Sequence, residues 1–182
     1  MKPKKSIIIA GSRGIGKAIS NSLKTISKKT ISLSSKDLDT SNIKQVYSFI
    51  KKEKQTDVLV LNTGGPPAIN FFEIDDNTWS KYINQLFFSF IIILRDLKIN
   101  KNGFIFLISS FHIKEINQKL PISNSLRSAT WSVLKSVTEE LSKFNISTIN
   151  IAPGPFDTDR IRSLNPDLEK VKSKLILKQL GK

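Results

Sequence analysis

The chain has no cysteine and no long hydrophobic run. Without cysteine, disulfide bonds and thiolate metal sites are excluded, and a reducing compartment is the simplest setting. The apolar run at residues 7–10 follows a basic N-terminal segment. It is too short for the core of a signal peptide and far below the roughly 20 residues that span a bilayer. We therefore expect a cytoplasmic protein with no membrane segment and no metal site.

Acidic residues are scarce, since 15 Asp and Glu stand against 29 Lys and Arg and give a net charge of +14. Such an excess could neutralise a nucleic-acid backbone. However, most of the basic residues are lysines scattered along the chain, without the arginine clusters or interleaved aromatic residues of a nucleic-acid binder. We therefore interpret them as a solvated surface, and a nucleic-acid partner is supported by charge alone.

The chain does have the composition of an ordinary globular domain, with 182 residues of which 39% are hydrophobic. Short β-branched runs alternate with segments of helical period, a pattern typical of a parallel sheet. The predicted strands are residues 6–10, 30–33, 57–61, 103–109 and 146–152. The fold class that follows is α/β, a Rossmann-type doubly wound parallel sheet in three α/β/α layers, formed by residues 1–182 as one domain.

Apolar residues recur at helical spacing between these strands, so amphipathic helices are predicted near residues 15–26, 43–50 and 123–144. We expect these helices to cover both faces of the sheet. Their apolar faces are formed by Ile15, Ala18, Ile19, Leu23 and Ile26, by Ile43, Val46, Tyr47 and Ile50, and by Leu126, Ala129, Val133, Val137 and Leu141.

A further helix at residues 78–98 differs because residues 86–94 leave it no polar face. A helix of this kind is buried on all sides, yet this stretch is too short to cross a bilayer. A second protein surface is the better explanation. We expect a homodimer or homotetramer formed through the helices at residues 78–98 and 123–144.

A glycine-rich turn follows the first predicted strand and opens the first helix. It consists of Gly11, Ser12, Arg13, Gly14, Ile15 and Gly16. Glycines at such a turn let the backbone approach a pyrophosphate, and the N–H groups and dipole of the helix N-terminus stabilise its negative charge. The alternative is a plain strand-to-helix turn, but its position in a strand-turn-helix unit favours dinucleotide binding.

Three later segments also follow predicted strands. They are Leu61-Asn62-Thr63-Gly64-Gly65, Ile108-Ser109-Ser110 and Ala152-Pro153-Gly154-Pro155-Phe156-Asp157-Thr158. Because the carboxyl ends of parallel strands meet at one edge of a sheet, we expect all four segments to form one site. In order and spacing they resemble the glycine motif, the Asn-Asn-Ala-Gly segment, the serine segment and the Pro-Gly-x-x-x-Thr element of the short-chain dehydrogenase/reductase family. The resemblance covers nearly the whole chain.

The resemblance implies an NAD(P)-dependent oxidoreductase that acts on the carbonyl or hydroxyl group of a small or acyl-chain substrate. It also implies which residues bind the cofactor. These are Gly11, Ser12, Arg13, Gly14, Ile15, Gly16, Ser34, Ser35, Asp39, Asn62, Thr63, Gly64, Arg127, Pro153, Gly154, Phe156 and Thr158.

The end of the second strand bears on the choice of cofactor. NAD sites usually have an acidic residue there, whereas a nearby arginine suits the 2′-phosphate of NADP. Here Ser34 and Ser35 end the strand and Arg13 projects from the turn, which favours NADP(H) and leaves NAD(H) possible. Asp39 resembles the family's adenine-contacting aspartate, or it is the N-cap of the helix that begins at Ile43.

The catalytic positions depart from the family pattern. In the family a tyrosine donates the proton, a lysine four residues later lowers its pKa and holds the ribose, and a serine orients the substrate. Ser110 matches the serine, but Ser123 and Arg127 replace the tyrosine and the lysine, and the family's asparagine position falls on Leu86. Helical spacing places Ser123 and Arg127 on one face, so Arg127 can still reach a ribose. The resemblance therefore implies Ser110, Ser123 and Arg127 as the catalytic residues.

A serine hydroxyl is far less acidic than a phenol, so the proton donor is not evident. Candidates are Tyr82, His112 and Lys114. The segments at residues 62–67 and 123–127 resemble a divergent, 3-oxoacyl-reductase-like branch of the family in which Ser-Asn-x-x-Arg replaces Tyr-x-x-x-Lys. A cofactor-binding pseudoenzyme or regulatory subunit without turnover is the alternative.

Three further departures concern length and the glycine motif. Little room separates the second strand from Asp39, so a helix that normally covers that edge is missing. After Thr158 a polar helical stretch stands where the family continues to a final helix and strand. We therefore expect a fold shortened at the C-terminus that lacks the last strand. Either the chain is truncated, or a partner covers the edge of the sheet that this strand would otherwise cover. In the glycine motif, the family's first glycine falls on Ala10 and its threonine on Ile9.

Overall fold

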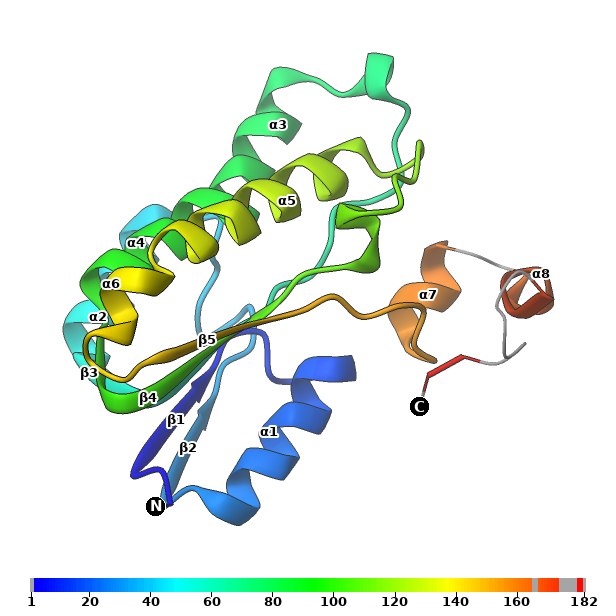
Figure 1. Ribbon diagram of the computed structural model, residues 1–182. Helices are drawn as coiled ribbons and strands as arrows, with labels where there is room; N and C mark the ends of the chain where they lie inside the picture. The colour runs from blue at the N-terminus through cyan, green and yellow to red at the C-terminus, as the bar shows by residue number, and fades with distance from the viewer. Residues whose placement is uncertain (1, 165–166, 174–179, 182) are drawn as a thin grey trace.

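The computed structural model describes residues 2–164, 167–173 and 180–181. Its centre is a sheet of five parallel strands in the order β2-β1-β3-β4-β5 (Figure 1). The strands are β1 (Lys5–Ile8), β2 (Lys29–Ser32), β3 (Gln55–Leu61), β4 (Lys98–Ile108) and β5 (Ser147–Ile151). Every predicted strand is present, and the predicted Rossmann-type α/β fold class is confirmed. β4 begins earlier than predicted because Lys98 and Ile99 also pair with β3.

The strand order reverses direction once, and this reversal positions the site. From β1 the chain moves outward to β2, and then it returns past β1 to β3, β4 and β5. Right-handed crossovers place the helices of the two directions on opposite faces of the sheet. The reversal lies between β1 and β3, and ligands bind at the carboxyl ends of strands at such a point.

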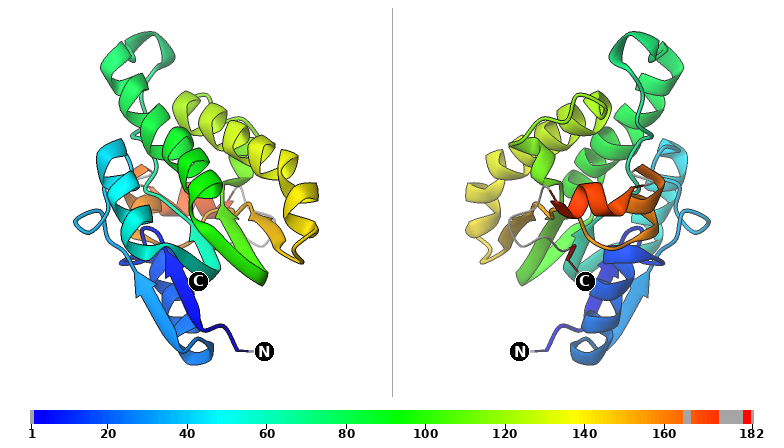
Figure 2. Two further views of the ribbon diagram at one scale, coloured as in Figure 1. Left: turned by 90° about the vertical axis from the view of Figure 1, so that its left-hand side faces the viewer. Right: turned by 90° about the vertical axis from the view of Figure 1, so that its right-hand side faces the viewer.

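The helices follow this rule. Helix α1 (Gly14–Ile26) lies alone on one face, and α2 (Ile43–Glu53), α3 (Asp76–Ile83), α4 (Ser89–Asp96), α5 (Pro121–Ser136) and α6 (Thr138–Ser142) lie on the other side (Figures 1 and 2). The larger core forms on the second side, where Ile7, Leu59 and Ile105 pack with Phe90 and Ile93 of α4. A smaller core lies beneath α1. Three layers result, as predicted.

Helices lie on both faces of the sheet, as expected, but in the described residues α1 covers only part of its face. Phe104, Ile149 and Ile151 point to the α1 side and remain 40%, 39% and 41% exposed. An open apolar groove of about 540 Å³ runs between α1 and this part of the sheet. The reason is topological, because only the crossover from β1 to β2 places a helix on this face. β5 is an edge strand, with no strand on its outer side in the described part of the chain.

The predicted helix at residues 78–98 is instead three consecutive segments. A π-helical segment, η2 (Asn84–Phe88), separates α3 from α4. Leu86, Phe90 and Ile93 are buried within the chain's own core, whereas Ile83 and Phe88 are 40% and 43% exposed. Most of the apolar surface that suggested a partner is therefore used inside the chain.

The helix predicted at residues 123–144 ends earlier, because Val137 interrupts it between α5 and α6. Beyond β5, the polar stretch forms α7 (Asp159–Leu164) and α8 (Leu168–Ser173). Both lie past the carboxyl end of β5 (Figure 1). Gly181 then pairs with Phe156, while Lys182 lies outside the described residues. In the described ranges, no helix is both long and apolar enough to cross a membrane.

Candidate functional site

The glycine turn connects β1 to α1. Gly11 donates its N–H to the carbonyl oxygen of Leu33 at 2.8 Å, which holds the turn against the end of β2. A Cβ at Gly11 would collide with the hydroxyl oxygen of Ser32, and a Cβ at Gly16 would collide with the carbonyl oxygen of Ala10. The close approach of the backbone therefore requires glycine at Gly16, whereas at Gly11 the side chains of Ser32 and Ile8 leave no room for a Cβ.

Two residues of this turn have a left-handed backbone, Ala10 at φ 50° and Gly14 at φ 52°. Glycine adopts this conformation freely, whereas a Cβ there costs roughly 1–2 kcal/mol. Ala10 occupies the position of the family's first glycine. The turn thus tolerates the methyl group at the cost of backbone strain.

The N-terminus of α1 is available to an anion. Arg13 is the N-cap residue, but no side chain caps the helix, and its first turn has no acidic residue. The N–H groups of that turn lack helical partners and carry a partial positive charge. Ser12 and Arg13 are exposed beside them. This end of α1 suits a phosphate group.

Asn62 joins the ends of β1 and β3. Its Nδ2 donates to the carbonyl oxygen of Ala10 at 3.0 Å, which places Thr63 and Gly64 beside the glycine turn. No heavy atom lies within 4 Å of where a Cβ would stand at Gly64, or at Gly154 after β5. Packing within the described residues does not require glycine at either position. Both instead leave open space at the edge where a ligand binds.

The end of β2 carries a carboxylate that the sequence analysis missed. Oδ2 of Asp37 accepts hydrogen bonds from the hydroxyl of Ser34 at 2.6 Å and from its N–H at 2.8 Å. These bonds, chiefly that of the hydroxyl, lower the pKa of Asp37. A charged carboxylate therefore lies beside the exposed Ser35. The Ser-x-x-Asp spacing, typical of a local side-chain turn, was the signal that could have revealed it.

Asp39 stabilises a turn and does not cap α2. Its Oδ1 accepts from the N–H and the hydroxyl of Ser41 at 2.9 and 2.7 Å. Asn42 is the N-cap of α2, and its side chain accepts from the N–H of Gln45 at 3.3 Å. The N-cap interpretation of Asp39 is wrong, because α2 begins at Ile43 and the residue directly before it, Asn42, is the N-cap.

Ser123 and Arg127 lie together on α5, as predicted from their spacing. Nε of Arg127 donates to Oγ of Ser123 at 3.1 Å. Nη1 donates to the carbonyl oxygens of Ile108 and Ser109 at 3.0 and 3.3 Å, and Nη2 to that of Thr63 at 3.4 Å. Arg127 therefore joins the carboxyl ends of β3 and β4. Burial lowers its pKa to about 10, so it stays protonated at neutral pH.

Ser110 lies at the end of β4 but is not bonded to this pair. Its Oγ accepts from the N–H of His112 at 3.2 Å and caps a short 3-10 helix, η3 (Phe111–Ile113). Among the hydrogen bonds of the described residues, none joins Ser110 to Ser123 or Arg127. The structure thus connects two of the three predicted catalytic residues directly, and connects Ser110 only through its neighbour Ser109.

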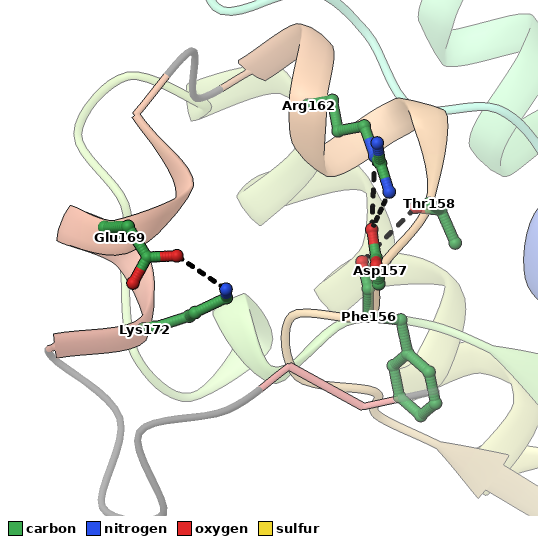
Figure 3. Close-up of polar contacts among 6 residues, drawn as sticks. All are labelled: Phe156, Asp157, Thr158, Arg162, Glu169 and Lys172. Atoms are coloured by element: carbon green, nitrogen blue, oxygen red, sulfur yellow. Dashed lines mark hydrogen bonds and ion pairs between the residues drawn. The ribbon is translucent and has the colours of Figure 1, made fainter.

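The loop after β5 reaches the glycine turn from the opposite side. The carbonyl oxygen of Pro153 accepts from the N–H of Phe111 at 3.1 Å. The methyl carbon of Thr158 lies 3.6 Å from where a Cβ would stand at Gly14. Figure 3 shows Phe156 and Thr158 together with the ion pair of Asp157 and Arg162. Phe156 and Thr158 also line the apolar groove beside α1.

The arginines of the chain fall into two groups. Arg95 and Arg162 pair with aspartates, each at 2.6 Å. Arg13, Arg127 and Arg160 make no ion pair with a carboxylate in the described residues. Arg160 lies within electrostatic reach of both Arg13 and Arg127. Burial, with repulsion from Arg160, lowers the pKa of Arg127, and burial, with repulsion from Arg13, lowers that of Arg160.

The sequence analysis also missed Gln85. Its Nε2 donates to Oγ1 of Thr63 at 3.1 Å and to the carbonyl oxygen of Gly64 at 3.0 Å. Leu86, the expected asparagine position, is 1% exposed and packs against Ile122. The π-helical segment changes the register here, and nothing in the sequence pattern predicted that change.

The three candidate proton donors differ in position. Tyr82 is half-buried and lies close to Arg160. Its proximity raises the pKa of Arg160, although the burial of Arg160 lowers that pKa by more. Nδ1 of His112 contacts the carbonyl oxygen of Glu115 at 2.9 Å. Lys114 is exposed. Only Tyr82 is therefore linked to one of the three arginines without a carboxylate partner.

Comparison with known proteins agrees with this geometry. The family model for short chain dehydrogenases matches residues 28–169. The chain belongs to the short-chain dehydrogenase family. The glycine turn precedes the matched segment, so its assignment rests on the fold and on the contacts described above. No curated protein sequence matches this chain.

Solved short-chain dehydrogenase structures share the fold. BdcA in complex with NADPH is 19% identical, with a TM-score of 0.86 over 98% of this chain and 81% of that one. L-sorbose reductase from Gluconobacter frateurii, complexed with NADPH and L-sorbose, is 20% identical, with a TM-score of 0.80 over 100% and 85%. A short chain dehydrogenase from Burkholderia cenocepacia in complex with NADP is 16% identical, with a TM-score of 0.83 over 98% and 84%.

Proposed function

We propose that this short-chain dehydrogenase binds NADP(H) at the carboxyl edge of its sheet and reduces or oxidises the carbonyl or hydroxyl group of a small or acyl-chain substrate. One observation carries the proposal. The uncapped N-terminus of α1, with no acidic residue in its first turn, lies at the same edge as three arginines that pair with no carboxylate among the described residues. Similar structures that contain NADPH or NADP support the same interpretation.

The residues present fit a dinucleotide. The glycine turn and the N–H groups of α1 would hold the pyrophosphate. Gly64 and Gly154 would leave room for the nicotinamide half, because a Cβ at either position meets open space. Ser34, Ser35 and Asp39, near the end of β2, would contact the adenosine half. Ile15, Asn62, Pro153, Phe156 and Thr158 would complete the cofactor site.

A bound nicotinamide supplies or accepts the hydride, so the chain has to hold the substrate oxygen and manage its proton. Arg127 donates to Oγ of Ser123, which leaves the Ser123 hydroxyl hydrogen free to donate to a substrate oxygen. The Ser110 oxygen likewise accepts from a backbone N–H, and its own hydrogen stays available. We assign both hydroxyls to the substrate oxygen and Arg127 to holding Ser123 and the ribose.

The nucleotide preference rests on two opposing charges, Arg13 in the glycine turn and Asp37 in the loop after β2. Arg13 favours the 2′-phosphate of NADP(H), whereas the carboxylate of Asp37 favours NAD(H). Since Asp37 already accepts two hydrogen bonds from Ser34, we propose that NADP(H) is preferred. Asp37→Asn should then tighten NADPH binding and leave NADH binding nearly unchanged. Tighter binding of NADH than of NADPH by the unmodified protein would contradict the preference.

Binding is tested by fluorescence titration with NADPH, with an expected dissociation constant in the micromolar range. Gly64→Val should weaken binding by about tenfold or more, because its side chain fills space assigned to the cofactor. Its stability should change by less than about 0.5 kcal/mol, since no heavy atom of the described residues lies within 4 Å of where the Cβ would stand. Ala68→Val, at an exposed position of the same loop, is the control and should bind as the unmodified protein does. Unchanged affinity in Gly64→Val would refute this placement.

Turnover separates the enzyme from a cofactor-binding protein without activity. We expect NADPH oxidation with at least one member of a broad carbonyl panel, and loss of it in Ser123→Ala without loss of NADPH binding. Tyr82→Phe then tests the candidate acid that the structure places near Arg160. If NADPH binds but no carbonyl is reduced, the hypothesis of a regulatory subunit without turnover replaces the hypothesis of an enzyme.

We also propose that the protein forms a homodimer or homotetramer through the helices at residues 78–98 and 123–144. The exposed Ile83 and Phe88 of the first region support this surface. Their exposed area is smaller than the sequence suggested, because Phe90, Ile92 and Ile93 are buried within the chain.

A further inference from the structure

Arg160 crosses from one loop of the site to another. It belongs to α7, beyond β5, and its Nη2 donates to the carbonyl oxygen of Pro66 in the loop after β3. The same nitrogen lies 3.0 Å from where a Cβ would stand at Gly65. The half-buried guanidinium therefore packs directly on this loop, next to the open space at Gly64.

Two guanidinium groups contact this one loop. Arg127 donates to the carbonyl oxygen of Thr63, and Arg160 donates to that of Pro66, so Gly64 lies between their attachment points. Arg127 is nearly saturated, since it makes four hydrogen bonds of the five that a guanidinium can donate. The guanidinium of Arg160 donates one hydrogen bond in the described residues. Arg127 thus keeps at most one N–H for the ribose, whereas Arg160 has several N–H groups left for a ligand.

No carboxylate of the described residues compensates the charge of Arg160. A partly buried cation without a carboxylate is unfavourable, and a second and third cation nearby make it more so. Arg13 and Arg127 both repel Arg160. An anion that enters between them would relieve this repulsion and gain charge-assisted hydrogen bonds.

We propose that Arg160 binds a multiply charged anion at this site, and that this anion is the pyrophosphate of the dinucleotide. The assignment rests on the proposed cofactor function. Two contacts favour the pyrophosphate over an acid group of the substrate. Arg160 lies in reach of Arg13, which is part of the glycine turn, and Thr158 of the same segment lies against Gly14. Arginine also suits bidentate binding of phosphate oxygens.

The test compares Arg160→Gln with Arg162→Gln. Arg162 belongs to the same helix, but it pairs with Asp157 at 2.6 Å and is therefore a matched control (Figure 3). Binding of NADPH, of inorganic pyrophosphate and of malonate to each variant is measured by calorimetry. Arg160→Gln should weaken both NADPH and pyrophosphate about tenfold or more, as expected for loss of a charged hydrogen bond. Arg162→Gln should change them less than twofold, and Arg160→Lys should restore part of the affinity.

The outcomes separate this inference from the proposed function. If the unmodified protein binds pyrophosphate in an Arg160-dependent way but does not bind NADPH, Arg160 is an anion site and the cofactor proposal fails. If Arg160→Gln weakens only malonate, the anion belongs to a substrate acid group and the pyrophosphate assignment is overturned. Equal affinities of Arg160→Gln and Arg162→Gln for all three probes would overturn the anion site itself.

Discussion

At the scale of single residues, the carboxyl edge holds strain and charge that the surrounding fold has to offset. Ala10 adopts φ 50°, a conformation that suits glycine, because Asn62 and the turn around Gly11 hold it in place. Arg127 keeps its charge without an acidic partner in the described part of the chain, because four oxygen atoms accept its hydrogen bonds. Both residues therefore depend on neighbours from other strands.

Replacing Ala10 with glycine should remove the strain at the turn. We expect Ala10→Gly to raise the free energy of unfolding by up to about 1 kcal/mol, because the left-handed backbone no longer carries a Cβ. Ala18→Gly, at an exposed position of α1, should instead lower it by roughly 1 kcal/mol. Urea denaturation measures both. Equal losses in the two variants would mean that Ala10 is not strained.

At the scale of elements, side chains join neighbouring strands at both ends of the sheet. Asn62 joins β1 and β3 at the carboxyl end. At the amino end, Oδ2 of Asp57 on β3 accepts from the N–H of Lys5 at 2.7 Å, and Oδ1 accepts from Asn100 at 2.7 Å. Burial alone would raise the pKa of Asp57, but these hydrogen bonds outweigh it and lower the pKa below its ordinary value.

The lowered pKa predicts how acid affects stability. A carboxyl group whose pKa falls on folding contributes stability above its unfolded pKa of about 3.9, and that contribution is lost as the pH falls through the folded value. Asp57→Asn should therefore be less stable at pH 7 and lose less stability than the unmodified protein between about pH 5 and pH 3. Glu139→Gln, an exposed residue of α6, is the control. Identical pH profiles for Asp57→Asn and the unmodified protein, measured by urea denaturation, would contradict this role.

At the scale of the whole molecule, the two faces of the sheet are unequal. The face that carries α2 to α6 holds the main core, while the α1 face leaves Phe104 and Ile151 exposed beside an apolar groove. Two surfaces could therefore contact another chain. The proposed one includes Phe88, which is 43% exposed, and the other includes Phe104, which is 40% exposed.

These two phenylalanines provide a matched pair for testing the oligomer. We expect Phe88→Glu to convert the homo-oligomer to a monomer, because a charge would be buried in the interface, and Phe104→Glu to leave the assembly intact. Sedimentation velocity measures both. If only Phe104→Glu dissociates the assembly, the interface lies on the α1 face. A monomeric unmodified protein would refute the proposed oligomer.

The sequence by itself determined the fold class, the five strands and the four loops that form the site. Hydrophobic periodicity is local, and parallel strands necessarily bring their carboxyl ends to one edge. The pairing of Ser123 with Arg127 was also predictable, because helical spacing sets it.

The tertiary structure alone decided what depends on contacts between distant residues. Right-handed crossovers after the reversal at β1 left part of one face without a helix, and a π-helical segment directed Gln85 rather than Leu86 to the site. The partners of Arg127 and Arg160 lie in loops far away in the sequence. No local pattern shows that these arginines pair with no carboxylate across the described ranges, because an ion pair depends on which side chains the fold brings together.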